Sequence, residues 1–98
     1  MKTKDNILTQ LKKVKAVAVS IGIDQLGLFG SYARNEQQAN SDIDILIHFK
    51  PEQANYANFL AICTLLEDSF SGEKIEIVTR AGLSPHLESR ILEEVTYV

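Results

Sequence analysis

The hydrophobic positions in two long segments of this chain recur with the period of an α-helix. Residues 5–21 carry one apolar face, and Gly22 follows where a helix would end. Residues 52–70 carry a second apolar face, which the Ser-Gly pair at 71–72 interrupts. The two stripes consist of Ile7, Leu11, Val14, Ala18 and Ile21, and of Phe59, Ile62, Cys63, Leu66 and Phe70. The pattern predicts two long helices, each with one face buried against a core.

Two shorter helices complete the helical pattern. Ser31 belongs to a residue type favoured at helix N-caps, and it predicts the start of a brief helix. Pro85 predicts the first turn of the last helix, because the missing N–H of proline is harmless there. The buried side of this last helix is expected at Leu87, Ile91 and Val95.

Three strand-like segments lie between these helices. Residues 25–30, QLGLFG, are mostly apolar and predict a short buried strand that ends at Gly30. Residues 42–49, DIDILIHF, alternate strictly between an isoleucine face and a mixed face, and Pro51 follows the strand. Residues 74–79, KIEIVT, alternate in the same way. The three segments therefore predict a small sheet.

The element order α-β-α-β-α-β-α within 98 residues predicts one α/β domain that spans residues 1–98. We expect a three-stranded mixed sheet with helices packed mainly on one face. The polar residues 36–41 would form a loop before the second strand. The other face of the sheet, near Asp42 and Asp44, would stay open.

Composition narrows the possible functions. A net charge of -3, from 10 basic and 13 acidic residues, argues against direct nucleic-acid binding, which usually requires a basic footprint. Lys12, Lys13 and Lys15 are explained most simply as a solvated helix face, with a docking surface for an acidic partner as the alternative. Cys63, the single cysteine, is expected in the core. We find no signal-peptide pattern and no apolar run of about 20 residues, so we expect a cytoplasmic protein.

Asp42 and Asp44 lie two residues apart on one face of a predicted strand. Strand geometry separates them by roughly 6 to 7 Å, and carboxylates so close repel each other unless a cation lies between them. Carboxylate oxygens suit Mg²⁺, which also binds substrate phosphates. Glu76, inside the third strand, can face the same site if the second and third strands are neighbours. Three carboxylates could hold two metal ions, an arrangement used for phosphoryl transfer.

Gly30 and Ser31 supply features that suit a phosphate. Glycine allows close backbone approach to a ligand, and the free N–H groups at the start of a helix can bind phosphate. Arg34, one turn further on, could reach the same phosphates with its forked donors. Together with the aspartates, the spacing of these residues favours a metal and phosphate site.

Each of these residues also has a plainer interpretation. A Gly-Ser pair before a helix is a common turn, and Asp-x-Asp on a strand is usually a polar face. Arg34 could pair with Glu36 or Asp42, and Ser41 could be a turn residue only.

Residues 30–47, GSYARNEQQANSDIDILI, resemble the signature of the polymerase-β-like nucleotidyltransferase superfamily: Gly-Ser, ten residues, then Asp-x-Asp. The short chain, the segment KIEIVT and the closing ESRILEEVTYV resemble specifically its minimal nucleotidyltransferase (MNT) domains. The resemblance covers nearly the whole chain, and its central motif is the most specific part. It implies the polymerase-β-like nucleotidyltransferase fold.

The resemblance also implies roles for individual residues. Asp42 and Asp44 would bind two Mg²⁺ ions, and Glu76 would complete the site as catalytic residue and metal ligand, helping to deprotonate an acceptor hydroxyl. Gly30 and Ser31 would hold the β- and γ-phosphates of ATP. The implied nucleotide-binding set is Gly30, Ser31, Arg34 and Ser41.

The implied activity is transfer of AMP from ATP to a hydroxyl with release of pyrophosphate. Members of this family are often paired with a helical HEPN protein, a toxin ribonuclease, and act as its antitoxin. In some pairs the MNT protein adds AMP to a tyrosine of the toxin. The resemblance therefore implies an AMPylating antitoxin.

Two departures from the family pattern keep alternatives open. Asn35 stands where the family often has glycine, although asparagine tolerates left-handed backbone better than most residues. Glu76 stands where the third acid is often aspartate. A catalytically weak or inactive antitoxin that neutralises the toxin by binding alone is therefore an alternative. A transferase acting on an aminoglycoside-like small molecule or an RNA end is another, which the short chain and the acidic balance disfavour.

Overall fold

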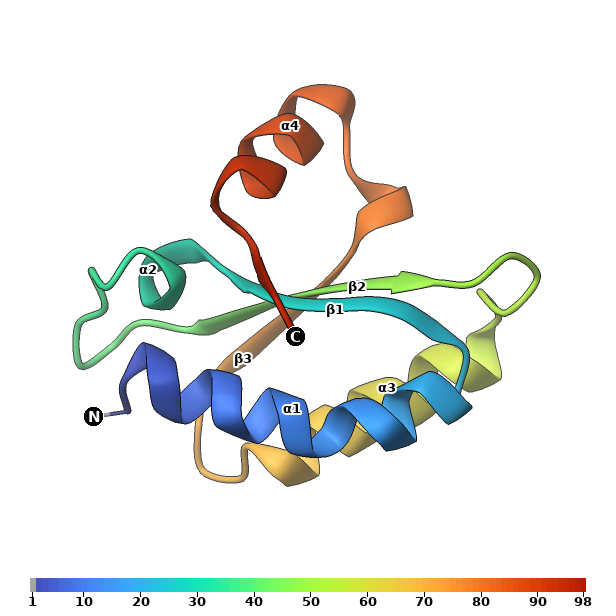
Figure 1. Cartoon of the computed structure of the whole chain (residues 1–98), viewed down its shortest axis with the longest axis horizontal. Helices are drawn as coiled ribbons and strands as arrows, with labels where there is room; N and C mark the ends of the chain where they lie inside the picture. The colour runs from blue at the N-terminus through green and yellow to red at the C-terminus, as the bar shows by residue number, and fades with distance from the viewer. Residues whose placement is uncertain (1) are drawn as a thin grey trace.

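A four-stranded sheet forms the framework of the protein in a computed structural model that describes residues 2–98. Figure 1 shows that helices lie on both faces of this sheet. Four helices, four strands and one 3₁₀ turn alternate along these residues. They are α1 (Lys4–Ser20), β1 (Ile23–Phe29), α2 (Gly30–Ala33), β2 (Ile43–Phe49), α3 (Tyr56–Ser69), β3 (Ile75–Thr79), η1 (Arg80–Gly82), α4 (Pro85–Glu94) and β4 (Thr96–Tyr97).

The strands are ordered β3-β2-β1-β4 across the sheet. β1 runs antiparallel to both of its neighbours, and β2 runs parallel to β3, so the predicted mixed sheet is confirmed. The predicted count of three strands is wrong, because the two residues of β4 add a fourth. Gly27 makes room for this strand, since a Cβ there would lie 2.7 Å from the Cγ2 of Val95.

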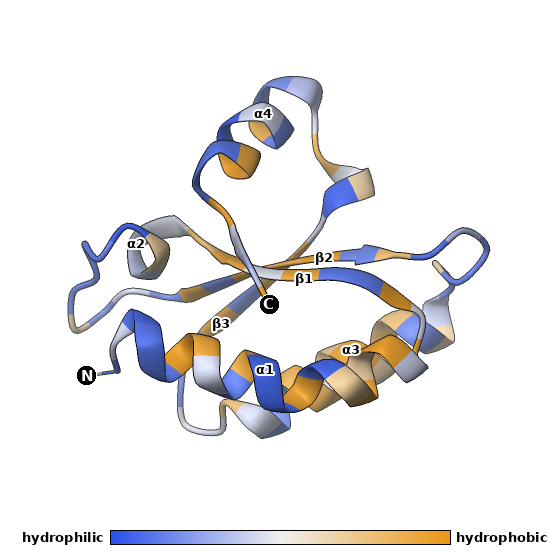
Figure 2. Cartoon of the chain, in the orientation of Figure 1, coloured by the Kyte–Doolittle hydropathy of each residue, from blue (hydrophilic) through white to orange (hydrophobic). Residues whose placement is uncertain are grey.

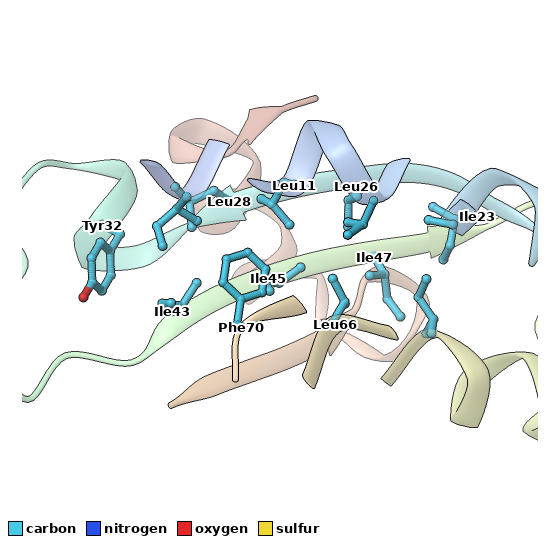
Figure 3. Packing of buried hydrophobic residues seen from close by; sticks show 14 of the residues in the cluster. Leu11, Ile23, Leu26, Leu28, Tyr32, Ile43, Ile45, Ile47, Leu66 and Phe70 are labelled. Atoms are coloured by element: carbon cyan, nitrogen blue, oxygen red, sulfur yellow. The ribbon is translucent and has the colours of Figure 1, made fainter. Parts of the chain in front are cut away.

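The main core lies between the sheet and the two long helices, α1 and α3. Ile43, Ile45 and Ile47 of β2 point into it and are buried, as the strand alternation predicted. Figure 3 shows these isoleucines meeting Leu11 of α1 and Leu66 of α3. The predicted apolar stripes of both helices are therefore confirmed.

The cysteine, the lysine cluster and the polar loop lie where the sequence predicted them relative to this core. Cys63 is half-buried and packs against the core, and burial raises the pKa of its thiol. The lysines at 12, 13 and 15 are exposed. The loop between α2 and β2 is hydrophilic (Figure 2). Among the described residues, none of the helices combines the length and hydrophobicity that a membrane crossing requires.

The opposite face of the sheet is covered in part by α4, so the expectation of an open face holds only for some of it (Figure 1). A second, smaller cluster forms there from Phe29, Leu46 and Ile91. Ile91 faces this cluster as predicted, but Leu87 is 45% exposed and does not belong to the buried side of α4. Val95 follows the end of α4 and packs against the cluster from the segment that leads into β4.

Two helix starts differ from the prediction. α3 begins at Tyr56 and not at residue 52, because Asn55 caps the helix by accepting a hydrogen bond from the Asn58 N–H at 2.9 Å. Glu52 has φ of 67°, which no right-handed helix contains. Ser31 is not the N-cap of α2: that helix begins at Gly30, after Phe29 in extended backbone.

Candidate functional site

Asp44 and Glu76 lie side by side on neighbouring strands. They are register partners in the parallel pair β2–β3, so their side chains share one face of the sheet. The second and third strands are therefore neighbours, which is the condition under which Glu76 can face the same site as Asp44. Their flanking residues, Ile43, Ile45, Ile75 and Ile77, belong to or pack against the core on the opposite face. Strand alternation thus places both acids on the face of α4.

Asp44 lies in a strongly acidic environment. Burial, followed by the charge of Glu76 and a hydrogen bond with it, raises the pKa of Asp44 to about 6. The charges of Asp42 and Glu94 raise the same pKa further. Four carboxyl groups therefore gather at one end of β2, where their mutual repulsion would be relieved by a cation.

Asp42 lies just before β2, and it is exposed. Within residues 2–98, no three side chains of His, Cys, Asp or Glu are already arranged as a metal-holding group. The structure thus brings Asp44 and Glu76 together, with Asp42 near enough to influence Asp44 electrostatically. The metal-binding role of the three acids remains a prediction.

Gly30 links these acids to the turn after β1. Its φ of 77° lies in the left-handed region that favours glycine. A Cβ at this position would lie 3.0 Å from the Cγ of Asp44 and would collide with the carboxylate itself. The backbone of Gly30 therefore approaches the Asp44 carboxylate so closely that only glycine, which has no side chain, fits there. Carboxylate oxygens next to an uncovered backbone turn suit a magnesium ion that also binds phosphate.

The Gly30 N–H already has an acidic partner. It donates a hydrogen bond to Glu94 Oε1 at 3.1 Å, and Arg34 Nη1 donates to Glu94 Oε2 at 2.7 Å. Arg34 Nε also donates to Glu36 Oε1 at 2.7 Å. Of the two alternative partners expected for Arg34, Glu36 is confirmed. Gly30 and Arg34 are therefore held together by one carboxylate from α4.

The remaining residues of the signature are placed in turns. Ser41 accepts a hydrogen bond from the Gln38 N–H at 2.8 Å and donates its own N–H to the Gln38 carbonyl, at 3.0 Å. It therefore acts as a turn residue, which was its plainer interpretation. Asn35 has φ of 58°, so it adopts the left-handed conformation expected of it. Ser31 lies in α2 and is half-buried.

Two hollows lie on the surface near the ends of β2. A polar hollow of about 320 Å³ is bordered by Tyr32, Ser41, Lys74 and their neighbours. An apolar hollow of about 340 Å³ lies at the far end, beside Phe49 and Tyr56. Neither of these two is lined by Asp44 or Glu76.

Glu94 is the residue of the candidate site that sequence reasoning missed. It lies 64 residues from Gly30, and in the sequence it is one of several glutamates in the last helix. Only the packing of α4 across the sheet brings it to the Gly-Ser turn, and no local pattern predicts that packing.

Comparison with known proteins places this geometry in a family. Residues 7–98 match the family model described as nucleotidyltransferase domain. A protein of Methanocaldococcus jannaschii, named as a candidate protein adenylyltransferase, is 34% identical over 102 residues that cover 100% of both chains. The protein adenylyltransferase MntA of Thermococcus cleftensis is 33% identical over 94 residues, covering 96% of this chain and 91% of the relative.

The fold has a counterpart among solved structures. A structure described as a candidate minimal nucleotidyltransferase matches this one with a TM-score of 0.82 and 25% sequence identity. The match covers 97% of this chain and 95% of the other.

Proposed function

Because this chain belongs to the nucleotidyltransferase domain family and has the fold of a minimal nucleotidyltransferase, we propose that it moves AMP from ATP to a hydroxyl group of a partner protein. The observation that carries this proposal is the pairing of Asp44 with Glu76, next to the bare backbone of Gly30. The relatives named as protein adenylyltransferases support a protein acceptor.

Asp42, Asp44 and Glu76 would together hold two Mg²⁺ ions. When bound, magnesium neutralises phosphate charge and polarises the reacting oxygens. Burial and the neighbouring carboxylates raise the pKa of Asp44, which supports this assignment, since a cation would favour the ionised form of Asp44. The Gly30 N–H, Ser31 and Arg34 would bind the β- and γ-phosphates of ATP. Ser41, which closes the turn before Asp42, would shape the rim of the same site.

The transfer would proceed by attack of the acceptor hydroxyl oxygen on the α-phosphorus of ATP. The new bond joins that oxygen to phosphorus, and the bond from the α-phosphorus to the bridging oxygen breaks, so pyrophosphate leaves. Glu76 is exposed on β3 and can accept the proton that the hydroxyl loses. The chain thereby supplies both the phosphate contacts and the general base.

The proposed acceptor is a tyrosine of a HEPN toxin, with this chain as the antitoxin. The MNT resemblance supports this partner, and the relative MntA of T. cleftensis, which is named as a protein adenylyltransferase, supports a protein acceptor. The exposed position of Glu76 also suits an acceptor that arrives on another protein.

An antitoxin that neutralises its partner by binding alone is the second candidate. Glu76 motivates it, because its carboxylate extends one methylene further than the aspartate that the family often has. The two candidates differ in what they require of Asp42 and Asp44: only the transferase needs both acids.

The test is incubation of the protein with ATP, Mg²⁺ and a candidate HEPN partner from the same organism, followed by intact mass measurement of the partner. We expect an AMP adduct with the native chain and none with D42N/D44N. The matched control is D24N/D68N, which removes two exposed aspartates from β1 and α3 and should leave the adduct intact.

The outcome separates the candidates. Absence of an adduct with folded native protein would contradict the transferase. Full neutralisation of the toxin by D42N/D44N would then establish the binding-only antitoxin.

A further inference from the structure

Glu94 engages two of the groups that the proposed function assigns to the nucleotide phosphates. Its two carboxylate oxygens accept from the Gly30 N–H and from Arg34 Nη1, at 3.1 and 2.7 Å. A carboxylate that binds one backbone N–H and one guanidinium uses the same donors that a phosphate oxygen would use. Both donors therefore already hold an anion that belongs to the chain.

The position of Glu94 is electrostatically unfavourable apart from these two contacts. It is the last residue of α4, where the partial negative charge of the helix end disfavours a carboxylate, and the last turn carries no basic residue. The neighbouring carboxylate of Asp44 adds repulsion, since the charge of Glu94 acts on Asp44. The contacts with Gly30 and Arg34 offset this unfavourable electrostatic environment of the Glu94 carboxylate.

The carboxylate of Glu94 is free to leave without disturbing the core. Its side chain is 26% exposed and that of Arg34 is 45% exposed, so both can turn toward water. Glu94 lies outside the cluster that fixes α4, which consists of Phe29, Leu46 and Ile91 with their apolar neighbours. Rotation of one side chain is enough to uncover the Gly30 N–H.

We propose that the Glu94 carboxylate occupies the phosphate-binding groups of Gly30 and Arg34 when no nucleotide is bound. The nucleotide phosphates must displace it, so Glu94 sets the affinity for the triphosphate. This inference rests on the proposed function, because it assumes that Gly30 and Arg34 are phosphate ligands. Removing the negative charge of Glu94 then strengthens binding, whereas a residue that merely positions Arg34 for phosphate would weaken binding when removed.

The test compares E94Q with E93Q by calorimetric titration with a non-hydrolysable ATP analogue in the presence of Mg²⁺. Both variants lose one negative charge in the last turn of α4, but Glu93 is exposed and has no contact with Gly30 or Arg34 among the described hydrogen bonds. We expect the Kd of E94Q to fall about fivefold, and that of E93Q to stay within about twofold of the native value. E94D, which keeps the charge but shortens the reach to Gly30, should also bind more tightly than the native chain, and serves if E94Q fails to fold.

An independent readout is the backbone amide signal of Gly30 in ¹H–¹⁵N NMR spectra. E94Q without nucleotide should shift this signal, and E93Q should not. Nucleotide binding to the native chain with equal or weaker binding to E94Q and E94D overturns the inference and leaves the proposed function intact. Failure of all folded variants and of the native chain to bind the analogue overturns both.

Discussion

The side chains of β2 point alternately to the two faces of the central sheet, and the two sets differ in burial and polarity. Ile43, Ile45 and Ile47 point toward α1 and α3 and are at most 1% exposed. Asp44, Leu46 and His48 point toward α4, and only Leu46 is fully buried among them. One strand thus carries the main core on one side and the candidate site on the other.

This difference shows how so short a chain accommodates both stability and chemistry. The two long helices, of 17 and 14 residues, cover one face, while the ten-residue α4 covers only part of the other (Figure 1). On the face of α4, burial and the charges of the neighbouring carboxylates raise the pKa of Asp44 and so favour its protonated form. Stability should therefore depend mainly on the isoleucine face, and activity mainly on the face of α4.

The largest expected effect on stability comes from truncating the isoleucine face. Ile45 and Leu46 are adjacent and both 0% exposed, but they point to opposite faces. We expect I45A to lower the free energy of unfolding by about 3 to 5 kcal/mol, and L46A by about 2 to 3 kcal/mol, because a thinner layer packs around Leu46. Urea unfolding of both variants measures the difference. An equal or larger loss for L46A would contradict the assignment of the main core to the α1–α3 side.

The second largest effect on stability is expected from adding a side chain at Gly30, next to Asp44. Gly30 and Gly72 both have positive φ, of 77° and 86°, but only Gly30 lies against another group. G72A should lower the free energy of unfolding by about 1 kcal/mol through backbone strain alone, whereas G30A should cost at least about 2 kcal/mol, since its methyl group collides with Asp44. Thermal unfolding gives both values. Equal losses of stability would show that Asp44 can move aside for a methyl group at position 30.

The third effect is the pH dependence of stability that Asp44 contributes. Its pKa of about 6 in the folded protein exceeds the ordinary value of 3.8, so folding favours the protonated form. This stabilisation is present below pH 3.8 and is lost as the pH rises through about 6. Without metal ions, the free energy of unfolding of the native chain minus that of D44N should therefore fall by about 1 to 2 kcal/mol between those limits, allowing for partial exposure to water. A difference that rises with pH would exclude acidic crowding at Asp44.

The smallest effect is expected at the outer edge of the site. Arg34 and Glu36 form an ion pair in which the side chains are 45% and 62% exposed. E36Q should change the free energy of unfolding by less than about 0.5 kcal/mol, because water screens exposed pairs. Chemical denaturation at low and high salt checks this expectation. A loss above about 1 kcal/mol would mean that Glu36 helps to order the turn after α2.

Much of the fold and site could be predicted from the sequence because the deciding signals are local. Strict alternation in residues 42–49 and 74–79 fixed which side chains face the core, and it placed Asp44 and Glu76 on the same side. The left-handed tolerance of Asn35 and the helix-start preference of Pro85 are likewise local, and both were confirmed.

Other features depend on contacts between distant segments, which local patterns do not determine. β4 exists because Gly27 of β1 leaves room for Val95 and Thr96, near the other end of the chain. The late start of α3 is, by contrast, a local effect, because Glu52 has positive φ and Asn55 caps the helix. Glu94 reaches Gly30 only through the packing of α4 on the second face of the sheet.

We propose that metal and nucleotide bind on the face of α4, at the start of β2. The most direct test of this proposal replaces Mg²⁺ with paramagnetic Mn²⁺ in the presence of ATP and follows line broadening of backbone amide signals by NMR. We predict that the signals of Gly30, Asp44 and Glu76 broaden first, while those of Ile62 and Leu66 in α3 persist. Broadening that begins in α3, or that leaves the signals of Asp44 and Glu76 unchanged, would place the metal elsewhere and contradict the proposed site.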